Sequence, residues 1–210
     1  MKTILCYGDS NTFGFSPETG TRYPRDVRWT GKLQELLGSD YYVIEEGCPG
    51  RTTVFDDPDD EWVNGKTQLI PCLKSHMPLD IVVLMLGTND LKAAFQASAG
   101  QIADGAGQLV KIIQDFPAPL QEYSPKVVLI SPPVIGNNLK QSFFYGMFQE
   151  DAIKRSRQFS ACYKHVAEQF GCEFLDAAEW VLSSDDDAIH LNAGAHSILA
   201  EKVKELVLRL

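Results

Sequence analysis

Three uninterrupted apolar runs constrain the fold of this chain most strongly. The clearest covers residues 81–86 (IVVLML), and two others cover residues 2–7 and 126–130. Their side chains do not alternate between apolar and polar, which indicates strands that are buried on both faces. Such strands are typical of a parallel sheet covered by helices. Two weaker strand candidates lie at residues 42–45 and 173–176.

Helical periodicity falls between these runs. Apolar side chains recur every three or four positions in four segments, namely residues 29–37, 102–116, 151–170 and 193–210. The alternation of strands and helices predicts an α/β sandwich with right-handed crossovers around a parallel sheet of about five strands. Because no linker, repeat or low-complexity tract interrupts the pattern, we expect residues 1–210 to form a single domain.

The charge and the cysteine content exclude several classes of protein. With 19 basic and 28 acidic residues the net charge is −9, so we expect no nucleic-acid partner. No apolar run approaches the length of a membrane span, and the start, MKTILCYGDS, lacks the features of a secretory signal. The five cysteines are widely spaced, as in reduced proteins. These observations predict a cytoplasmic protein.

Polar residues follow several of the predicted strands. The first strand ends in Gly8-Asp9-Ser10, the second leads into residues 46–53, and the third leads into residues 87–90. A fourth polar cluster, residues 187–190, directly precedes the last helix. Ligands bind beyond the carboxyl ends of the strands in sheets of this kind. The four clusters are therefore predicted to meet at one edge of the sheet.

The residue types in these clusters suit nucleophilic catalysis. A serine hydroxyl needs a nearby base, and that base needs an orienting partner. Ser10 is the candidate nucleophile, His190 the candidate base, and Asp187, three residues before it, the candidate orienting carboxylate. The backbone N–H groups of Ser10 and Gly50 and the side-chain amide of Asn89 are the candidate oxyanion donors.

This arrangement resembles the SGNH (GDSL-type) hydrolase family, whose four blocks supply Ser, Gly, Asn and His in that order, with Asp three residues before the His. The similarity runs from about residue 4 to about residue 199. Five further segments look like the arylesterase and acyltransferase branch: residues 26–31, 45–47, 51–53, 85–90 and 131–133. The resemblance implies a flavodoxin-like, three-layer α/β/α sandwich, no cofactor, a small acyl ester as substrate and a homo-oligomer.

Two positions depart from the family pattern. Asn11 follows the serine where the family usually has leucine, which would make the acyl pocket more polar and less suited to aryl esters. Pro49-Gly50 replaces the Ser-Ala that is frequent in the branch. Since the oxyanion donor of this block is a backbone N–H, Gly50 can still supply it.

Simpler interpretations exist for each site residue. Ser10 could cap a helix, and Asn89 could form an Asx turn at a strand end. Acids at positions 185–186 compete with Asp187 for the orienting role, although the spacing favours Asp187. The ordered occurrence of all the blocks favours the catalytic interpretation.

Candidate pocket residues are Asn11, Trp29, Phe143 and Phe144. Trp29 could equally anchor a helix in the core. The aromatic stretch at 143–148 could line the substrate entrance, form a lid or lie at a subunit interface. The acidic residues 56–60 lack the spacing of a calcium loop, so we expect a solvated loop there and no metal site.

The sequence thus predicts a serine esterase or acyltransferase that acts through an acyl-enzyme on Ser10, with an ester substrate and water or an alcohol as acceptor. A carbohydrate O-deacetylase or a thioesterase would use the same site. A non-enzymatic, flavodoxin-like module that holds a phosphate or flavin at residues 8–14 is a further alternative, although it would have no use for a distant Asp-x-x-His. No G-x-S-x-G elbow occurs, which argues against an α/β-hydrolase.

Overall fold

A computed structural model describes residues 1–116 and 121–210 of the chain. In these residues five parallel strands form one sheet in the order β2-β1-β3-β4-β5. The strands are β1 (Lys2–Gly8), β2 (Tyr41–Gly47), β3 (Ile81–Met85), β4 (Lys126–Ser131) and β5 (Glu173–Asp176).

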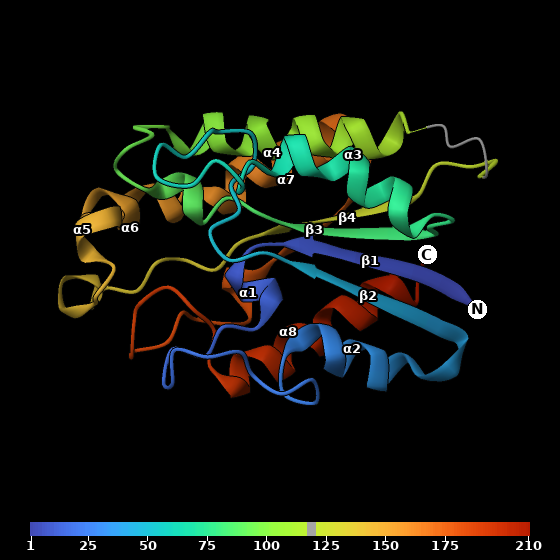
Figure 1. The fold of residues 1–210 in the computed structure, drawn as a ribbon, viewed down its shortest axis with the longest axis horizontal. Helices are drawn as coiled ribbons and strands as arrows, with labels where there is room; N and C mark the ends of the chain where they lie inside the picture. The colour runs from blue at the N-terminus through green and yellow to red at the C-terminus, as the bar shows by residue number, and fades with distance from the viewer. Residues whose placement is uncertain (117–120) are drawn as a thin grey trace.

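Helices cover both faces of this sheet (Figure 1). One face is covered by α2 (Trp29–Leu37) and α8 (Ala193–Val207), and the other by α3 (Gly65–His76), α4 (Ala99–Gln114) and α7 (Phe159–Phe170). The shorter helical elements are α1 (Ser10–Phe13), α5 (Tyr145–Phe148), α6 (Asp151–Ser156), and the 3-10 turns η1 (Gly38–Asp40), η2 (Asn89–Leu91), η3 (Leu139–Gln141) and η4 (Ala177–Glu179).

The buried side chains divide into two clusters, one on each face of the sheet. On β1, Leu5 and Tyr7 belong to the cluster under α3, α4 and α7, whereas Ile4 and Cys6 belong to the cluster under α2 and α8. Each fully buried apolar side chain contributes roughly 1.5–3 kcal/mol relative to exposure. Burial on both faces explains the unbroken apolar runs, and the predicted three-layer α/β/α sandwich is confirmed.

Two helical segments differ from the sequence prediction. The segment predicted as one helix over 151–170 is two helices, α6 and α7. The helix α3 was not predicted, because Pro71 lies inside it and removes a backbone donor. Asn64 caps the N-terminal end of α3, where its side chain accepts hydrogen bonds from Lys66 N and Thr67 N.

Two glycines allow α1 to pack against the carboxyl ends of the strands. Gly8 of β1 and Gly47 of β2 are paired in the sheet. A Cβ atom on Gly47 would lie 2.0 Å from Phe13 N, and one on Gly8 would lie 2.1 Å from Thr12 Oγ1. Both distances are far below van der Waals contact, so the close approach of α1 requires glycine at both positions.

None of the described helices is both long enough and apolar enough to cross a bilayer.

Candidate active site

Ser10 is the first residue of α1, and only Asp9 separates it from the end of β1. The Asp9 side chain caps this helix by accepting a hydrogen bond from Asn11 N at 2.9 Å. Gly14, with φ of +84°, ends the helix in the left-handed conformation. The single turn is therefore fixed at both ends, which places the Ser10 hydroxyl at the edge of the sheet.

Asp187 organises the loop that precedes α8. Its Oδ1 atom accepts hydrogen bonds from the N–H groups of Ile189 and His190, each at 2.9 Å, while Oδ2 lies 2.5 Å from His190 Nδ1. Burial opposes ionisation of this carboxyl group, but the hydrogen bonds and the nearby imidazole outweigh it and hold the pKa of Asp187 below its usual value. The carboxylate thus fixes both the backbone and the ring of His190.

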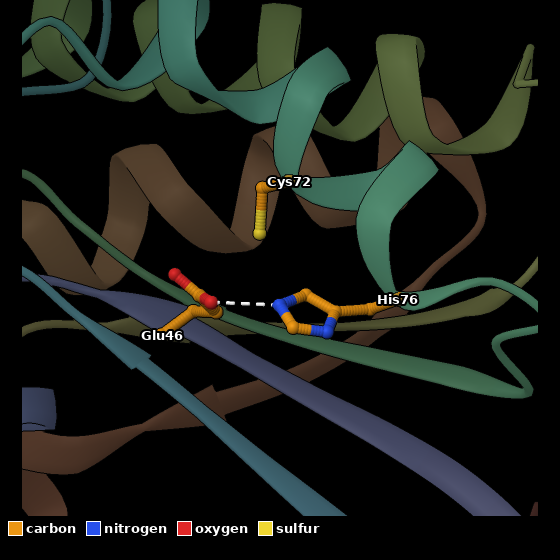
Figure 2. Close-up of side chains that lie close together, drawn as sticks. All are labelled: Glu46, Cys72 and His76. Atoms are coloured by element: carbon orange, nitrogen blue, oxygen red, sulfur yellow. Dashed lines mark hydrogen bonds and ion pairs between the residues drawn. The ribbon is translucent and has the colours of Figure 1, made fainter.

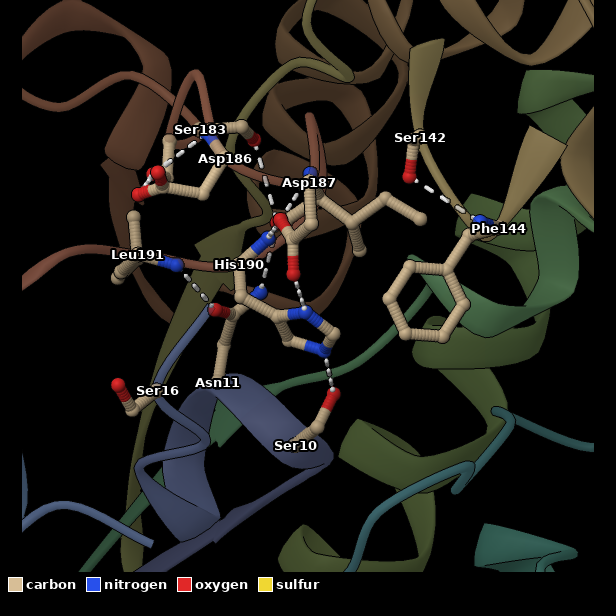
Figure 3. Close-up of polar contacts among 12 residues, drawn as sticks. Ser10, Asn11, Ser16, Ser142, Phe144, Ser183, Asp186, Asp187, His190 and Leu191 are labelled. Atoms are coloured by element: carbon tan, nitrogen blue, oxygen red, sulfur yellow. Dashed lines mark hydrogen bonds and ion pairs between the residues drawn. The ribbon is translucent and has the colours of Figure 1, made fainter. Parts of the chain in front are cut away.

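The two segments meet where the Ser10 hydroxyl contacts the His190 imidazole. His190 Nε2 lies 2.8 Å from Ser10 Oγ, although the two residues are 180 positions apart. Figure 3 shows Ser10, His190 and Asp187 as one continuous hydrogen-bonded chain. The hydroxyl can therefore donate to Nε2 while Nδ1–H donates to the carboxylate.

Asn11 links α1 to the histidine loop. Its Oδ1 accepts a hydrogen bond from Leu191 N at 2.9 Å, and its Nδ2 donates to Ile189 O at 3.4 Å (Figure 3). The side chain is only 1% exposed and lies outside the pocket beside Ser10. The prediction that Asn11 makes the acyl pocket more polar is therefore wrong, because successive helical residues point in different directions.

Asn89 and Gly50 lie beside Ser10. Asn89 starts η2 after β3, and its Nδ2 donates to Arg51 O at 3.1 Å, which leaves one amide hydrogen for a ligand. Gly50 has φ of +84° in the turn that follows β2. Within residues 1–116 and 121–210, the backbone N–H groups of Ser10 and Gly50 have no protein acceptor. Three donors are thus available at the same edge.

Arg51 stabilises this edge of the sheet through hydrogen bonds to the ends of two strands. It is 5% exposed, and its Nη1 donates to Gly8 O at 2.9 Å and also to Glu46 O. Its Nε donates to Gln68 Oε1 at 3.1 Å, and its guanidinium carbon lies 4.1 Å from the centre of the Tyr7 ring. One side chain therefore ties β1, β2 and α3 together next to the Gly50 turn. Residues 51–53 were noted only as part of the family resemblance, and this structural role of Arg51 was not predicted.

Two buried carboxyl groups lie behind the site. Asp90 accepts hydrogen bonds from Thr53 N at 2.9 and 3.1 Å and from Thr53 Oγ1. Burial raises the pKa of Asp90 to about 7 and that of Asp9 to about 6. Both groups therefore titrate close to neutral pH.

A pocket of about 220 Å³ opens beside the Ser10 hydroxyl. The Phe144 ring packs edge-on to the His190 imidazole, with 5.5 Å between the ring centres. The Phe15 ring lies on the same imidazole with 4.3 Å between the ring centres. Aromatic walls on both sides shield the histidine from water. The lining residues are Ser10, Phe15, Pro49, Gly50, Asn89, Lys92, Phe144, Met147, Phe148, Ile189 and His190.

Two predicted pocket residues lie elsewhere. Trp29 is completely buried in the core with α8, where its backbone N–H donates to His196 Nδ1 at 3.2 Å. Phe143 is 91% exposed, and its ring packs edge-on against the Phe144 ring with 5.6 Å between the ring centres. Neither residue lines the pocket beside Ser10, so the pocket role is wrong for both: Trp29 lies on the apolar face of α2, and Phe143 lies at the surface.

The acidic segment at 56–60 is not uniformly solvated. Asp57 is buried and forms an ion pair with Lys92 at 2.6 Å, so it holds a pocket-lining residue in place. The remaining acids of this segment are partly or fully exposed, as expected. Met147 and Phe148 belong to the 143–148 stretch that was considered as a lining of the entrance, and both line the pocket. Phe15 and Lys92 were missed because neither lies in a strand-end motif.

Comparison with known proteins identifies the family. Residues 6–198 match the GDSL-like Lipase/Acylhydrolase family. The chain belongs to this family. The sequence is 36% identical to that of Est24, a carbohydrate acetylesterase from Sinorhizobium meliloti. The two structures match with a TM-score of 0.93 over 100% of this chain and 99% of that one. The chain is 37% identical to the M. smegmatis aryl esterase, with a TM-score of 0.94 over 100% of both chains.

A more distant relative is an acetylxylan esterase from Xylanibacter ruminicola. It is 23% identical over 94% of this chain but only 41% of its own length, so the chain spans about two fifths of that relative. The resemblance stated from the four sequence blocks is confirmed, and the expectation of a carboxylic ester hydrolase is confirmed at the level of the family.

Proposed function

We propose that this GDSL-like protein is a serine esterase that cleaves small acyl esters through an acyl-enzyme on Ser10. The supporting observation is the hydrogen-bonded chain from Ser10 Oγ through His190 to Asp187, with distances of 2.8 and 2.5 Å, at the mouth of a pocket. A phosphate- or flavin-binding module would not need this chain. The geometry therefore favours nucleophilic catalysis.

In the first half-reaction, Ser10 Oγ attacks the ester carbonyl carbon while His190 Nε2 takes the hydroxyl proton. Asp187 stabilises the resulting imidazolium. Collapse of the tetrahedral intermediate breaks the bond to the leaving alkoxy group, which receives the proton from His190. Water, or an acceptor alcohol, then attacks the acyl-enzyme by the same proton route and releases Ser10.

The negative charge on the former carbonyl oxygen needs donors. We assign this role to the N–H groups of Ser10 and Gly50 and to the free amide hydrogen of Asn89, all of which belong to the pocket wall. One such donor typically lowers the barrier by roughly 3 kcal/mol. The hydrogen bond from Asn89 to Arg51 O orients the amide before substrate arrives.

The size of the pocket supports a short acyl group. Its volume of about 220 Å³ lies below the roughly 300–1,000 Å³ that is usual for drug-sized ligands. Phe144 and Phe148 form part of its wall. An acetyl or propionyl group fits such a space, and a long fatty acyl chain does not.

Removal of O-acetyl groups from carbohydrates is the second candidate function. Est24 and the acetylxylan esterase are described as acting on acetylated carbohydrates, and the same acyl pocket would serve. Turnover of p-nitrophenyl acetate, an acetylated xylo-oligosaccharide and acetyl thioester, compared at equal enzyme concentration, separates the aryl esterase, deacetylase and thioesterase alternatives. A repeat with an added alcohol measures acyl transfer.

We also propose that the chain acts as one domain, as a homo-oligomer and in the cytoplasm, without nucleic acid. The two GDSL-like structures above match the whole chain, and the exposed side chains of Phe143 and Leu182 offer apolar surface for a subunit contact. Light scattering of the purified protein measures the subunit number. Cell fractionation measures the location.

The proposal is tested by Ser10→Ala. We expect a folded variant whose kcat for p-nitrophenyl acetate is lower by at least about 1,000-fold. A fluorophosphonate probe should label the unmodified protein at Ser10, as read by peptide mass spectrometry. Ser197→Ala, which removes a partly exposed hydroxyl on α8 that donates only to Ala193 O, is the matched control and should keep both properties. Undiminished turnover by folded Ser10→Ala would overturn the mechanism.

A further inference from the structure

A second cluster of reactive side chains lies outside the pocket, between β2 and α3. Glu46 comes from the end of β2, and Cys72 and His76 come from α3. Because Cys72 and His76 are four residues apart in a helix, they lie on the same face. Figure 2 shows the thiol and the imidazole both directed toward the Glu46 carboxylate.

The distances in this cluster are close to those of a metal centre. His76 Nε2 lies 2.7 Å from Glu46 Oε1, and one ligand atom from each of the three side chains lies within 4.8 Å of the others. A tetrahedral zinc ion with bonds of about 2.0–2.3 Å places its ligand atoms about 3.3–3.8 Å apart. Side-chain movements of about 1 Å therefore suffice to close the cluster around an ion.

We propose that Glu46, Cys72 and His76 bind a divalent metal ion of the zinc class, with a fourth coordination position open to solvent. Sulfur, imidazole nitrogen and carboxylate oxygen together form a donor set that zinc favours. Magnesium and calcium prefer oxygen donors only, so they do not fit this set.

The backbone on both sides of the cluster is fixed, and the ion has a route from solvent. Glu46 is paired with Tyr7 in the sheet, and its carbonyl accepts a hydrogen bond from Arg51. The side chains of Glu46 and His76 are 31% and 28% exposed. A site with rigid supports and partly exposed ligands can take up an ion without unfolding of the protein.

The local charges favour a bound cation. A zinc-class ion binds cysteine as the thiolate, so the Cys72 sulfur and the Glu46 carboxylate together supply two negative charges. These exceed the single positive charge of the nearby Arg51 guanidinium.

The competing explanation is purely structural. The hydrogen bond between His76 and Glu46 would then only attach the end of α3 to β2, and Cys72 would fill space between them. Cobalt(II) distinguishes the two, because it occupies zinc sites and shows a sulfur-to-metal charge-transfer band together with intense visible bands when it is tetrahedral.

The test is a Co²⁺ titration of the full-length, metal-free protein. We expect a saturable charge-transfer band with one ion per chain, which stoichiometric Zn²⁺ abolishes. Cys72→Ser should lose the band, and His76→Gln should weaken Co²⁺ binding by more than about tenfold, since even indirect support of a ligand is worth roughly that much. Circular dichroism confirms that each variant is folded.

Two control variants match the thiol and the imidazole. Cys172→Ser removes another half-buried thiol, and His165→Gln removes a histidine on α7; both should retain the band. Absence of the band in the unmodified protein overturns the proposal, as does a band that survives in folded Cys72→Ser. A band that is lost in Cys172→Ser instead would place the cobalt elsewhere and would also overturn it.

Discussion

Two histidine–carboxylate pairs in this molecule look alike but differ in their third partner and in their exposure. His190 lies 2.5 Å from Asp187, and His76 lies 2.7 Å from Glu46. The first pair is almost completely buried and is completed by the Ser10 hydroxyl beside a pocket. The second pair is about one third exposed and is completed by the Cys72 thiol.

This difference decides the chemistry that each pair can support. A nucleophile needs a base that can take its proton and a space in which the substrate carbonyl can lie, and both are present next to Ser10. The pKa of about 12 keeps the Cys72 thiol protonated, so it is a poor nucleophile in the absence of a metal. A histidine beside a carboxylate therefore does not define a function without its third partner.

The largest fall in kcat among these variants is expected for Asp187→Asn, which removes the carboxylate of the buried pair. The amide cannot stabilise the imidazolium and favours the wrong tautomer of His190, so kcat for p-nitrophenyl acetate should fall by about 10,000-fold. Asp185→Asn, which changes an exposed neighbouring acid, should stay within about twofold and is the matched control. An equal loss in both variants would show that loop structure, and not the carboxylate, is responsible.

A smaller effect is expected for Asn89→Ala. The loss of one oxyanion donor should lower kcat by about 100- to 1,000-fold and leave KM nearly unchanged, because the donor acts mainly in the transition state. Steady-state kinetics with p-nitrophenyl acetate give both parameters. Asn137→Ala, at an exposed position that contacts Arg157, should have little effect. A rise in KM alone would assign Asn89 to ground-state binding.

Asn11→Leu should affect the buried His190–Asp187 pair and leave the His76–Glu46 pair unchanged, because Asn11 holds the histidine loop. The substitution leaves Leu191 N without its acceptor, so the free energy of unfolding in urea should fall by roughly 1–3 kcal/mol. The histidine loop should also lose order, which would lower kcat by about tenfold. Thr12→Val is the control, since its buried hydroxyl has no partner within the described residues and its loss should not destabilise the fold. Unchanged stability in Asn11→Leu would remove Asn11 from this positioning role.

The smallest effect concerns the carboxyl groups behind the site. Because their folded pKa values, about 6 for Asp9 and about 7 for Asp90, lie above the unfolded values, the folded state binds more protons between about pH 4 and 7. Their contribution to stability is therefore complete below pH 4 and is lost as the pH rises through 7. Asp90→Asn should flatten this part of the curve of unfolding free energy against pH. A slope that is the same in both proteins would contradict the raised pKa.

Much of the fold and of the chain from Ser10 to His190 could be predicted because the signals are local or follow from topology. The apolar runs identify the strands, and the rule that parallel strands end at one edge brings Ser10, Asn89 and residues 187–190 together. The spacing from Asp187 to His190 fits a single turn. These inferences require no knowledge of side-chain packing.

The features that were missed depend on packing or on an unrecognised helix. The orientation of Asn11 follows from the rotation of α1, and the burial of Trp29 follows from the face that α2 presents to α8. Because Pro71 interrupts the helical pattern of α3, the spacing of Cys72 and His76 was not recognised as one helical face. The expectation of no metal site considered only the acidic residues 56–60, whereas the structure also brings Cys72 and His76 to Glu46.

The contact between Ser10 and His190 also has a consequence during translation. The ribosome synthesises Ser10 180 residues before His190. A polypeptide that stops before the histidine therefore carries the hydroxyl without this hydrogen-bond partner. Under the proposed mechanism, such a truncated chain would be unable to hydrolyse esters.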